Sequence, residues 1–324
     1  MFKRNEDDNK PSLSVDDRDF IKIMDTDFRK SPNGNWSAPL PFRSNRQTLP
    51  NNYDYAFNRA KSLHISLQRN EIKRQHFIEF MGKVLENGHA EIASALHNNE
   101  ECWYLPVFGV YHPQKPEQIR CVFDSSAKFK GVSLNSIMLQ GPDLTNSLLG
   151  ILLRFQRELV AVVADIQQMF YSFYVHQKHR DFLRFIWYQD NNPNKPLVEY
   201  RMCVHVFGNS PSPAIATYGL RKSVENADED VKLFVNRDFY VDDALTSLPT
   251  ISEAVSLMKR TQRALEKSNL VLHKVASNKE EVILAFPSDQ LANSLKAGVS
   301  NSIAQRAKTQ ITRKVAGPNR INIQ

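Results

Sequence analysis

Cysteine is scarce in this sequence. The three cysteines, Cys102, Cys121 and Cys203, are well separated, and no two of them have the close spacing of paired zinc ligands. This pattern argues against both a disulfide framework and a zinc cluster. We therefore expect the protein to work in a reducing, intracellular compartment, with the cytoplasm as the expected location and the nucleus as an alternative.

Long apolar runs are also lacking. The longest covers residues 159–164 and stops at Asp165, and no apolar stretch follows the charged residues at the N-terminus. The sequence thus predicts neither a secretory signal nor a membrane-spanning helix, and we expect no membrane partner. With 324 residues, 41% of them hydrophobic and 24% charged, the chain is long enough to bury a core without disulfide or metal staples.

Acidic residues are missing from the last part of the sequence. Residues 293–324 contain six lysines and arginines and no Asp or Glu, so they supply six of the seven net positive charges and leave +1 for residues 1–292. A basic tail is typical of proteins that bind nucleic acid, but a solvated chain end without a ligand has the same composition. Both interpretations stay open at this point.

The order of the sequence patterns predicts an α+β fold. Residues 1–52 are polar and carry several prolines, so we expect an extended N-terminal arm with little regular structure. Apolar spacing predicts helices over 53–87 (two helices), 143–156 with Asp143 as the N-cap, 213–226 and 252–267. Strands are predicted over 104–111, 119–123, 159–164, 182–188, 199–207, 231–235, 239–241, 271–276 and 281–285. Strands and helices do not alternate regularly, which favours α+β over a parallel α/β sheet.

Asp165 is the first candidate functional residue. It follows the apolar run 159–164, which is rich in β-branched residues and is typical of a buried central strand. A carboxylate at the end of such a strand needs a partner, because burying an unpaired charge is costly. A cation or metal ion is one such partner, and a simple helix cap for the segment beginning at Ile166 is the alternative.

Asp242 and Asp243 are the second candidate. These adjacent acids interrupt the apolar run 239–245, where like charges repel unless a cation lies beside them. An ordinary Asp-Asp turn is the alternative, but the strand-end aspartate Asp165 favours a shared ion. Oxygen ligands from two segments suit Mg²⁺ or Mn²⁺ rather than zinc. Two such ions about 3.5–4 Å apart promote phosphoryl transfer, so nucleotidyl transfer is the resulting hypothesis.

The motifs around these acids resemble those of retroelement reverse transcriptases, most closely the BEL/Pao group of long-terminal-repeat retrotransposons. The motifs follow the family's order along the chain. They occupy residues 49–53, 103–106, 120–128, 133–135, 141–144, 149–155, 164–170, 180–185, 207–208, 212–213, 240–243 and 274–278. The resemblance implies the fingers and palm portion of a Pol polyprotein, which is a right-hand polymerase with a mixed, largely antiparallel palm sheet.

The resemblance also implies roles for individual residues near the acids. Asp165, Asp242 and Asp243 match the family's catalytic carboxylates, which hold two Mg²⁺ (or Mn²⁺) ions with the Ile166 carbonyl as a further ligand. Phe170 matches the aromatic side chain that excludes a ribose 2′-hydroxyl by its bulk, although a bare Phe170 is more often an ordinary core residue.

Four further residues match binding or proton-transfer positions of the family. Lys115 and Arg120 fall in a hairpin that covers the incoming nucleotide, and a guanidinium suits bidentate phosphate binding. Gly208 falls in the loop that approaches the templating base, where a small residue permits close backbone approach. Lys274 matches a lysine proposed to protonate pyrophosphate. For Lys115 and Lys274, an exposed cation without a role is the alternative.

The implied activity is that of an RNA-directed DNA polymerase, which adds deoxynucleotides to a primer 3′-hydroxyl on an RNA or DNA template. Gln167, Gln168 and Val206 depart from the family's usual residues, as does the segment 267–269, and no thumb is recognisable after about residue 286. We therefore expect an arm over 1–52, a fingers and palm domain over 53–290, and a basic tail with a truncated or atypical thumb over 291–324. A catalytically weak or inactive nucleic-acid-binding remnant is one alternative, and a two-metal nuclease or phosphatase is another.

Overall fold

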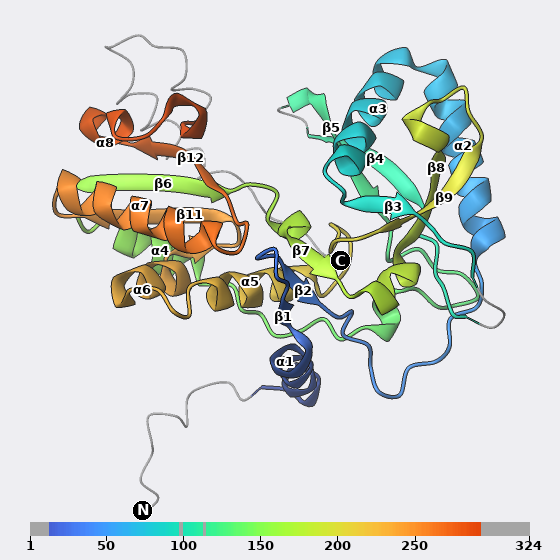
Figure 1. Cartoon of the computed structure of the whole chain (residues 1–324), viewed down its shortest axis with the longest axis horizontal. Helices are drawn as coiled ribbons and strands as arrows, with labels where there is room; N and C mark the ends of the chain where they lie inside the picture. The colour runs from blue at the N-terminus through green and yellow to red at the C-terminus, as the bar shows by residue number, and fades with distance from the viewer. Residues whose placement is uncertain (1–12, 97–99, 113–114, 293–324) are drawn as a thin grey trace, which may run out of the picture. The chain divides into compact units, whose positions relative to one another are not determined.

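The computed structural model describes residues 13–96, 100–112 and 115–292 (Figure 1). These residues divide into two compact units that each contain several separate chain segments. Unit 1 comprises 13–31, 36–143 and 173–215, and unit 2 comprises 32–35, 144–172 and 216–292. Almost all of the expected tail, 291–324, lies outside the described residues. In the part of the chain that the structure describes, no helix is long and apolar enough to cross a bilayer.

Unit 1 combines helices with small, mostly antiparallel sheets. Its helices are α1 (Val15–Asp27), α2 (Tyr53–Arg69) and α3 (Glu71–Glu86). Its strands are β1 (Arg29–Lys30), β2 (Trp36–Ala38), β3 (Ala90–Ile92), β4 (Val107–His112), β5 (Lys115–Phe123), β7 (Phe173–Val175), β8 (Arg184–Tyr188) and β9 (Leu197–Met202). One sheet has the order β3-β9-β8, and β4 and β5 form a hairpin. In the third sheet, β2 pairs antiparallel with β1 and parallel with β7.

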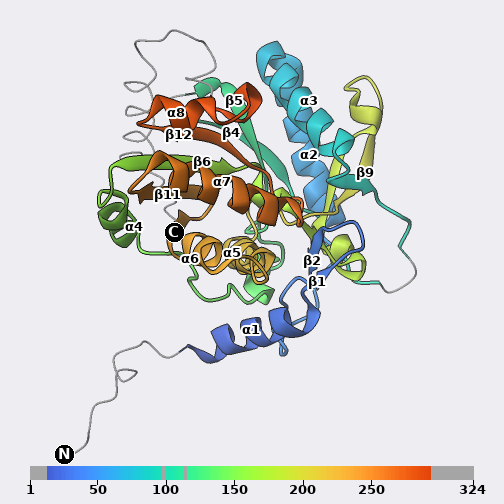
Figure 2. The same cartoon turned by 60° about the vertical axis from the view of Figure 1, so that its left-hand side comes forward.

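Unit 2 is built on one antiparallel sheet. Its strands, β6 (Val160–Ile166), β10 (Phe239–Tyr240), β11 (Asp243–Leu248) and β12 (Leu272–Ser277), have the order β10-β11-β6-β12. Its helices are α4 (Leu148–Phe155), α6 (Glu229–Arg237), α7 (Ile251–Glu266) and α8 (Glu280–Leu284), with most of α5 (Ser212–Ser223). Figure 2 shows α7 running across this sheet, and its apolar face, which includes Ala254, Met258 and Leu265, is buried. The chain is therefore a mixed α+β protein with antiparallel sheets, as the sequence predicted.

Most sequence-predicted elements of the sheet regions are present. The two helices α2 and α3 form over 53–87, the hairpin β4–β5 forms over 107–123, and the buried run after Leu159 becomes β6. The long helix α7 and strand β12 also form where the apolar patterns place them. The Thr250 side chain accepts a hydrogen bond from the Glu253 N–H, and the Glu253 side chain accepts one from the Thr250 N–H. This capping box explains where α7 begins.

Four predictions about secondary structure are wrong. The N-terminal arm is not devoid of regular structure, because Ser14 caps α1 and α1 buries Phe20 and Met24. The helix expected from Asp143 begins only at residue 148, since Ser147 rather than Asp143 is the cap. The strands expected over 231–235 and 281–285 are the helices α6 and α8.

Buried histidines give unit 1 a pH-dependent stability. Burial lowers the pKa of His179 to about 4 and that of His205 to about 3. The Leu40 N–H donates to Nδ1 of His179 at 3.0 Å, which requires that nitrogen to be unprotonated. Neither ring nitrogen of the buried His205 makes a hydrogen bond to a described residue. The backbone of Ala38 lies near the ring and raises the pKa of His205, but the effect of burial is larger.

We expect the free energy of unfolding to fall as the pH is lowered from 7 to 5. Both folded pKa values lie below the ordinary value near 6.5, so the unfolded chain binds more protons than the folded chain in this pH range. The two histidines therefore make their full contribution to stability only above this range. The loss is about 2 kcal/mol for a fully shielded histidine such as His205, and less for the partly exposed His179. Chemical denaturation at several pH values measures it.

The variant His179→Gln provides the matched control for this dependence. A glutamine oxygen can still accept from the Leu40 N–H, but the side chain does not titrate. The slope of stability against pH should therefore become shallower between pH 6.5 and 4.5. An unchanged slope in this variant would show that His179 does not contribute to it.

Candidate active site

The C-terminal end of β6 and the β10–β11 hairpin bring the three candidate aspartates together along the backbone. Asp165 is the register partner of Asp243 in the antiparallel pair of β6 and β11. The Ile166 N–H donates a hydrogen bond of 2.9 Å to the backbone carbonyl of Asp242, which occupies the turn between β10 and β11. Residues far apart in sequence are therefore neighbours at the ends of the two central strands of the unit 2 sheet.

The register continues into a row across all four strands. Tyr240 pairs with Asp243, Asp243 with Asp165, and Asp165 with His273. Directly opposed residues of neighbouring strands project from the same face, with Cβ atoms about 4.5–5.5 Å apart. Two carboxylates thus stand side by side on one face, flanked by a tyrosine and a histidine. Since opposed like charges destabilise a sheet, this pair requires a nearby cation.

Two side chains of β12 contact the central carboxylate. Nε2 of His273 lies 3.2 Å from Oδ1 of Asp165, and Nζ of Lys274 donates to the same oxygen at 3.3 Å. The Asp165 side chain is only 17% exposed, while that of Lys274 is 40% exposed. The sequence singled out Lys274, but it missed His273, whose signal is its position one residue earlier on the same predicted strand.

The backbone has unusual φ angles at two residues next to this row. Val241, the first turn residue of the hairpin, has φ of +56°, and Lys274 has φ of +53° at an irregularity in the β12–β6 pairing between His273 and Ala276. A β-branched residue in the left-handed region is unusual, and such strain persists only where the surrounding structure imposes it. At Lys274 the irregularity allows two consecutive residues of β12 to reach the same carboxylate.

The three aspartates fit a divalent cation in donor chemistry and in backbone placement. Carboxylate oxygens are the ligands that Mg²⁺ and Mn²⁺ prefer, and Asp165 and Asp243 are cross-strand neighbours. Among the described residues, however, no group of three or more His, Cys, Asp or Glu side chains is arranged to hold a metal ion. The metal set of Asp165, Ile166, Asp242 and Asp243 therefore stays a prediction.

Phe170 follows β6 closely in the same unit. It lies in a single 3₁₀ turn, Met169–Ser172, and its side chain is half-buried. Gln168 enters this turn with φ of +47°, and its carbonyl accepts from the Tyr171 N–H at 2.8 Å. Phe170 thus lies four residues after Ile166, the last residue of the strand that carries Asp165. Its expected contact with a sugar stays a prediction.

Lys115, Arg120 and Gly208 lie in unit 1. Lys115 and Arg120 fall in the expected hairpin, although Lys115 lies on strand β5 rather than in the loop before residue 119. Lys115 begins β5, and Arg120 is an exposed residue of the same strand, paired in register with Val110. Gly208 has φ of +123°, and a Cβ there would lie 2.5 Å from the carbonyl oxygen of Phe123. Any side chain at position 208 would therefore push the loop away from β5, which accounts for the glycine.

Asn135 fastens the loop that contains Gly208. Its Nδ2 donates to the Gly208 carbonyl at 3.0 Å and to Oγ of Ser126 at 2.9 Å, while its Oδ1 accepts from the Ser210 N–H at 2.9 Å. The Ser125 hydroxyl donates to Oδ1 of Asn209 in the same cluster. The sequence pointed to 133–135 as a motif but did not indicate this contact, because the two segments are more than 70 residues apart.

Comparisons with known proteins find similar solved structures, at low sequence identity. No family model matches the sequence, and no curated protein matches it. A solved foamy viral protease-reverse transcriptase in complex with double-stranded DNA is 16% identical, with 82% of this chain and 41% of that chain covered and a TM-score of 0.47. The native protease-reverse transcriptase of prototype foamy virus is 19% identical, with 60% and 23% covered and a TM-score of 0.44. This chain thus spans less than half the length of either protein.

Proposed function

We propose that this chain is the fingers and palm portion of an RNA-directed DNA polymerase, related to the BEL/Pao retrotransposon enzymes. It would add deoxynucleotides to a primer 3′-hydroxyl on an RNA or DNA template. Unit 2 would supply the palm, and the β4–β5 hairpin of unit 1 would belong to the fingers. The observation that supports the proposal is the register that pairs Asp165 with Asp243 and bonds Ile166 to Asp242.

The proposed chemistry assigns the aspartates to metal binding. Asp165, Asp242 and Asp243 would hold two Mg²⁺ or Mn²⁺ ions, with the Ile166 carbonyl as a further ligand. Bound divalent ions would make the primer hydroxyl more acidic and stabilise the charge on the leaving pyrophosphate. The paired carboxylates of β6 and β11 offer hard oxygen ligands on one face of the sheet, which is the arrangement that this role requires.

The remaining residues would bind and orient the nucleotide. Arg120, exposed on β5, would bind its phosphates together with Lys115. Phe170 would contact the sugar, and the loop at Gly208 would lie against the templating base. Lys274 would donate a proton to pyrophosphate, and its side chain, which is 40% exposed, is accessible for this role.

A catalytically weak, nucleic-acid-binding remnant is the second candidate, and one observation favours it. The Asp165 carboxylate contacts His273 and the Lys274 ammonium group, and the lysine can offset its charge without a metal ion. In that case an ion pair between Lys274 and Asp165 would stabilise the contact of β12 with the end of β6. The motifs would then persist as structure rather than as an active site.

Primer extension on an RNA template separates these candidates. The expected result is incorporation of deoxynucleotides that requires Mg²⁺ or Mn²⁺. Binding of the primer-template without incorporation would overturn the polymerase proposal in favour of the remnant. Metal-dependent degradation of the substrate would overturn it in favour of a nuclease. Because backbone contacts dominate such binding, affinity should fall as salt is raised.

Substituting Phe170 with valine should relax sugar selection. If the ring excludes the 2′-hydroxyl, its removal raises the efficiency of ribonucleotide use relative to deoxynucleotide use by about tenfold or more, since steric discrimination of one small group is worth roughly 1–3 kcal/mol. Single-nucleotide incorporation with dNTP and rNTP measures the ratio. Tyr171→Phe, one residue further along the same turn, provides the control and should leave the ratio unchanged. An unaltered ratio in Phe170→Val would remove this residue from the proposed role.

A further inference from the structure

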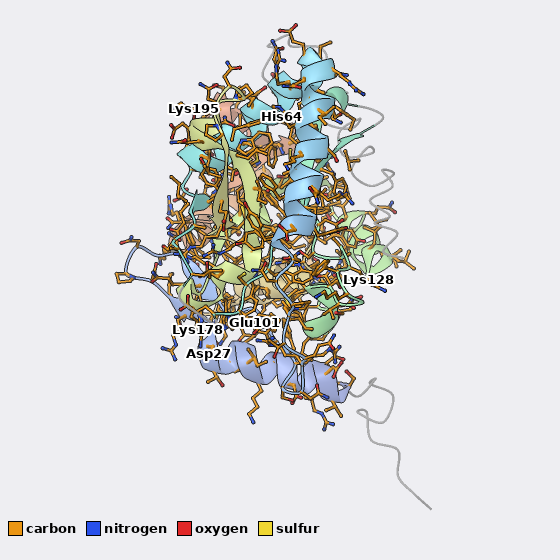
Figure 3. The ribbon with its side chains drawn as sticks, turned by 90° about the vertical axis from the view of Figure 1, so that its right-hand side faces the viewer. Asp27, His64, Glu101, Lys128, Lys178 and Lys195 are labelled. Carbon is orange, nitrogen blue, oxygen red and sulfur yellow. The ribbon has the colours of Figure 1, made fainter. Side chains whose placement is uncertain are left out.

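A groove beside the free edge of β3 has no part in the proposed polymerase chemistry. The cavity measures about 450 Å³ and lies wholly within unit 1. One wall is the C-terminal end of α3, including Leu85 and Glu86, and another is β3 itself. The turn after β8 closes one side, where Lys195, labelled in Figure 3, pairs with Asp190 at 2.6 Å. Such a volume accommodates several side chains of a short peptide.

The outer edge of β3 carries backbone hydrogen-bonding groups that β9 does not use. The Cys203 N–H donates to His89, the Ala93 N–H donates to Glu199, and Glu91 is the register partner of Arg201. Alternate residues of an antiparallel strand face alternate neighbours, so the N–H and C=O groups of Ala90 and Ile92 point away from β9. Within the described residues, β3 is the end of its sheet and no strand pairs with that side.

The side chains beside this edge are apolar and acidic. Ile92 is 62% exposed on a strand end, which is unusual for a large aliphatic side chain unless something covers it. Glu86 is the last residue of α3, where the helix dipole already places partial negative charge. The basic residue of that last turn, Lys83, pairs with Glu79 at 2.7 Å instead. Among the described residues, none forms an ion pair with Glu86.

We propose that the edge of β3 and this groove bind an extended peptide as an added strand. The peptide backbone would pair with Ile92, the exposed residue of this edge, since Ala90 is buried. Residues two apart in a strand project to the same face, so an aliphatic side chain would pack against Ile92 and a lysine or arginine two positions away would reach Glu86. The partner is therefore a protein segment with an aliphatic residue and a cation at i and i+2. This binding does not depend on the polymerase proposal.

Fluorescence polarisation with a labelled hexapeptide, Thr-Val-Thr-Lys-Thr-Val, tests this site on the full chain. We expect saturable binding, and a peptide with alternate amides N-methylated or with Glu in place of Lys should not bind. The variant Glu86→Gln should weaken binding about three- to fivefold, the worth of one exposed ion pair, and less at high salt. Glu79→Gln, on the same helix but outside the groove, should leave it unchanged.

Proline at position 92 provides the backbone test. The Ile92 N–H points outward, so Ile92→Pro removes no hydrogen bond to β9 but blocks pairing with an added strand. Binding should fall at least about tenfold. Lack of saturable binding at millimolar peptide, or binding insensitive to Glu86→Gln, would overturn the proposal whether or not the proline variant folds. Self-association of the chain that Ile92→Pro abolishes would overturn it in favour of a second copy as the occupant.

Discussion

Asp242→Asn should reduce deoxynucleotide incorporation on the order of a thousandfold while leaving the fold intact. The substitution removes one negative charge from a proposed metal set, and metal-ion stabilisation of the transferring phosphoryl group is worth several kcal/mol. The hairpin turn should survive, because the contact that ties it to β6 uses the backbone carbonyl of Asp242 and not its side chain. Single-turnover primer extension measures the rate, and thermal unfolding verifies the fold.

A matched acid elsewhere in unit 2 controls for the change in charge. Asp289→Asn alters an exposed carboxylate in the short turn Ser288–Gln290 and should leave incorporation unchanged. Primer-template affinity should also be similar in Asp242→Asn and wild type, because backbone phosphates rather than bases dominate binding. Undiminished incorporation in Asp242→Asn would exclude this carboxylate from catalysis and would leave the three-aspartate hypothesis without support.

The sequence predicted the strand ends that carry the three aspartates, but it did not predict that both His273 and Lys274 contact Asp165. An apolar run followed by Asp165 and a second run broken by Asp242 and Asp243 indicated two strand ends, and their register confirms that they are adjacent. His273 contacts Asp165 because β12 pairs with β6. An irregularity in the same pairing brings Lys274 to the same oxygen. Strand pairing over more than 100 residues is set by the whole sheet, so no local pattern reveals it.

The wrong predictions of secondary structure also have physical causes. In α6, Val231, Phe234 and Val235 are all buried at the i, i+3, i+4 spacing of a helix, although their β-branched and aromatic side chains favour strands when judged by type alone. Burial of one helical face therefore outweighed intrinsic propensity. The N-terminal segment is not a continuous extended arm, because it forms the short strands β1 and β2 and the helix α1, which buries Phe20 and Met24.

The network around Arg184 could not be predicted from the sequence either, since its members come from three separate segments. Arg184 is 2% exposed and donates to Oδ1 of Asp181 at 2.8 Å, to Oε2 of Glu199 at 2.7 Å and to the Ser94 carbonyl at 2.6 Å. Tyr104 donates to the same Glu199 oxygen at 2.7 Å. One guanidinium thus satisfies two acids and a backbone carbonyl, which ties β8 to β9 and to the chain after β3.

Arg184→Met should lower the free energy of unfolding by about 2 kcal/mol, because Glu199 and the Ser94 carbonyl lose this donor, while Asp181 keeps its ion pair with Arg201. Methionine fills a similar volume, so the loss reports the charge network rather than a cavity. Arg184→Lys should lose less, since it keeps the charge but not the forked geometry. Arg74→Met removes an exposed pair with Glu71 of 3.4 Å and should change stability by less than about 0.5 kcal/mol. Equal losses in Arg184→Met and Arg74→Met, measured by urea denaturation, would show that burial adds nothing to the Arg184 network.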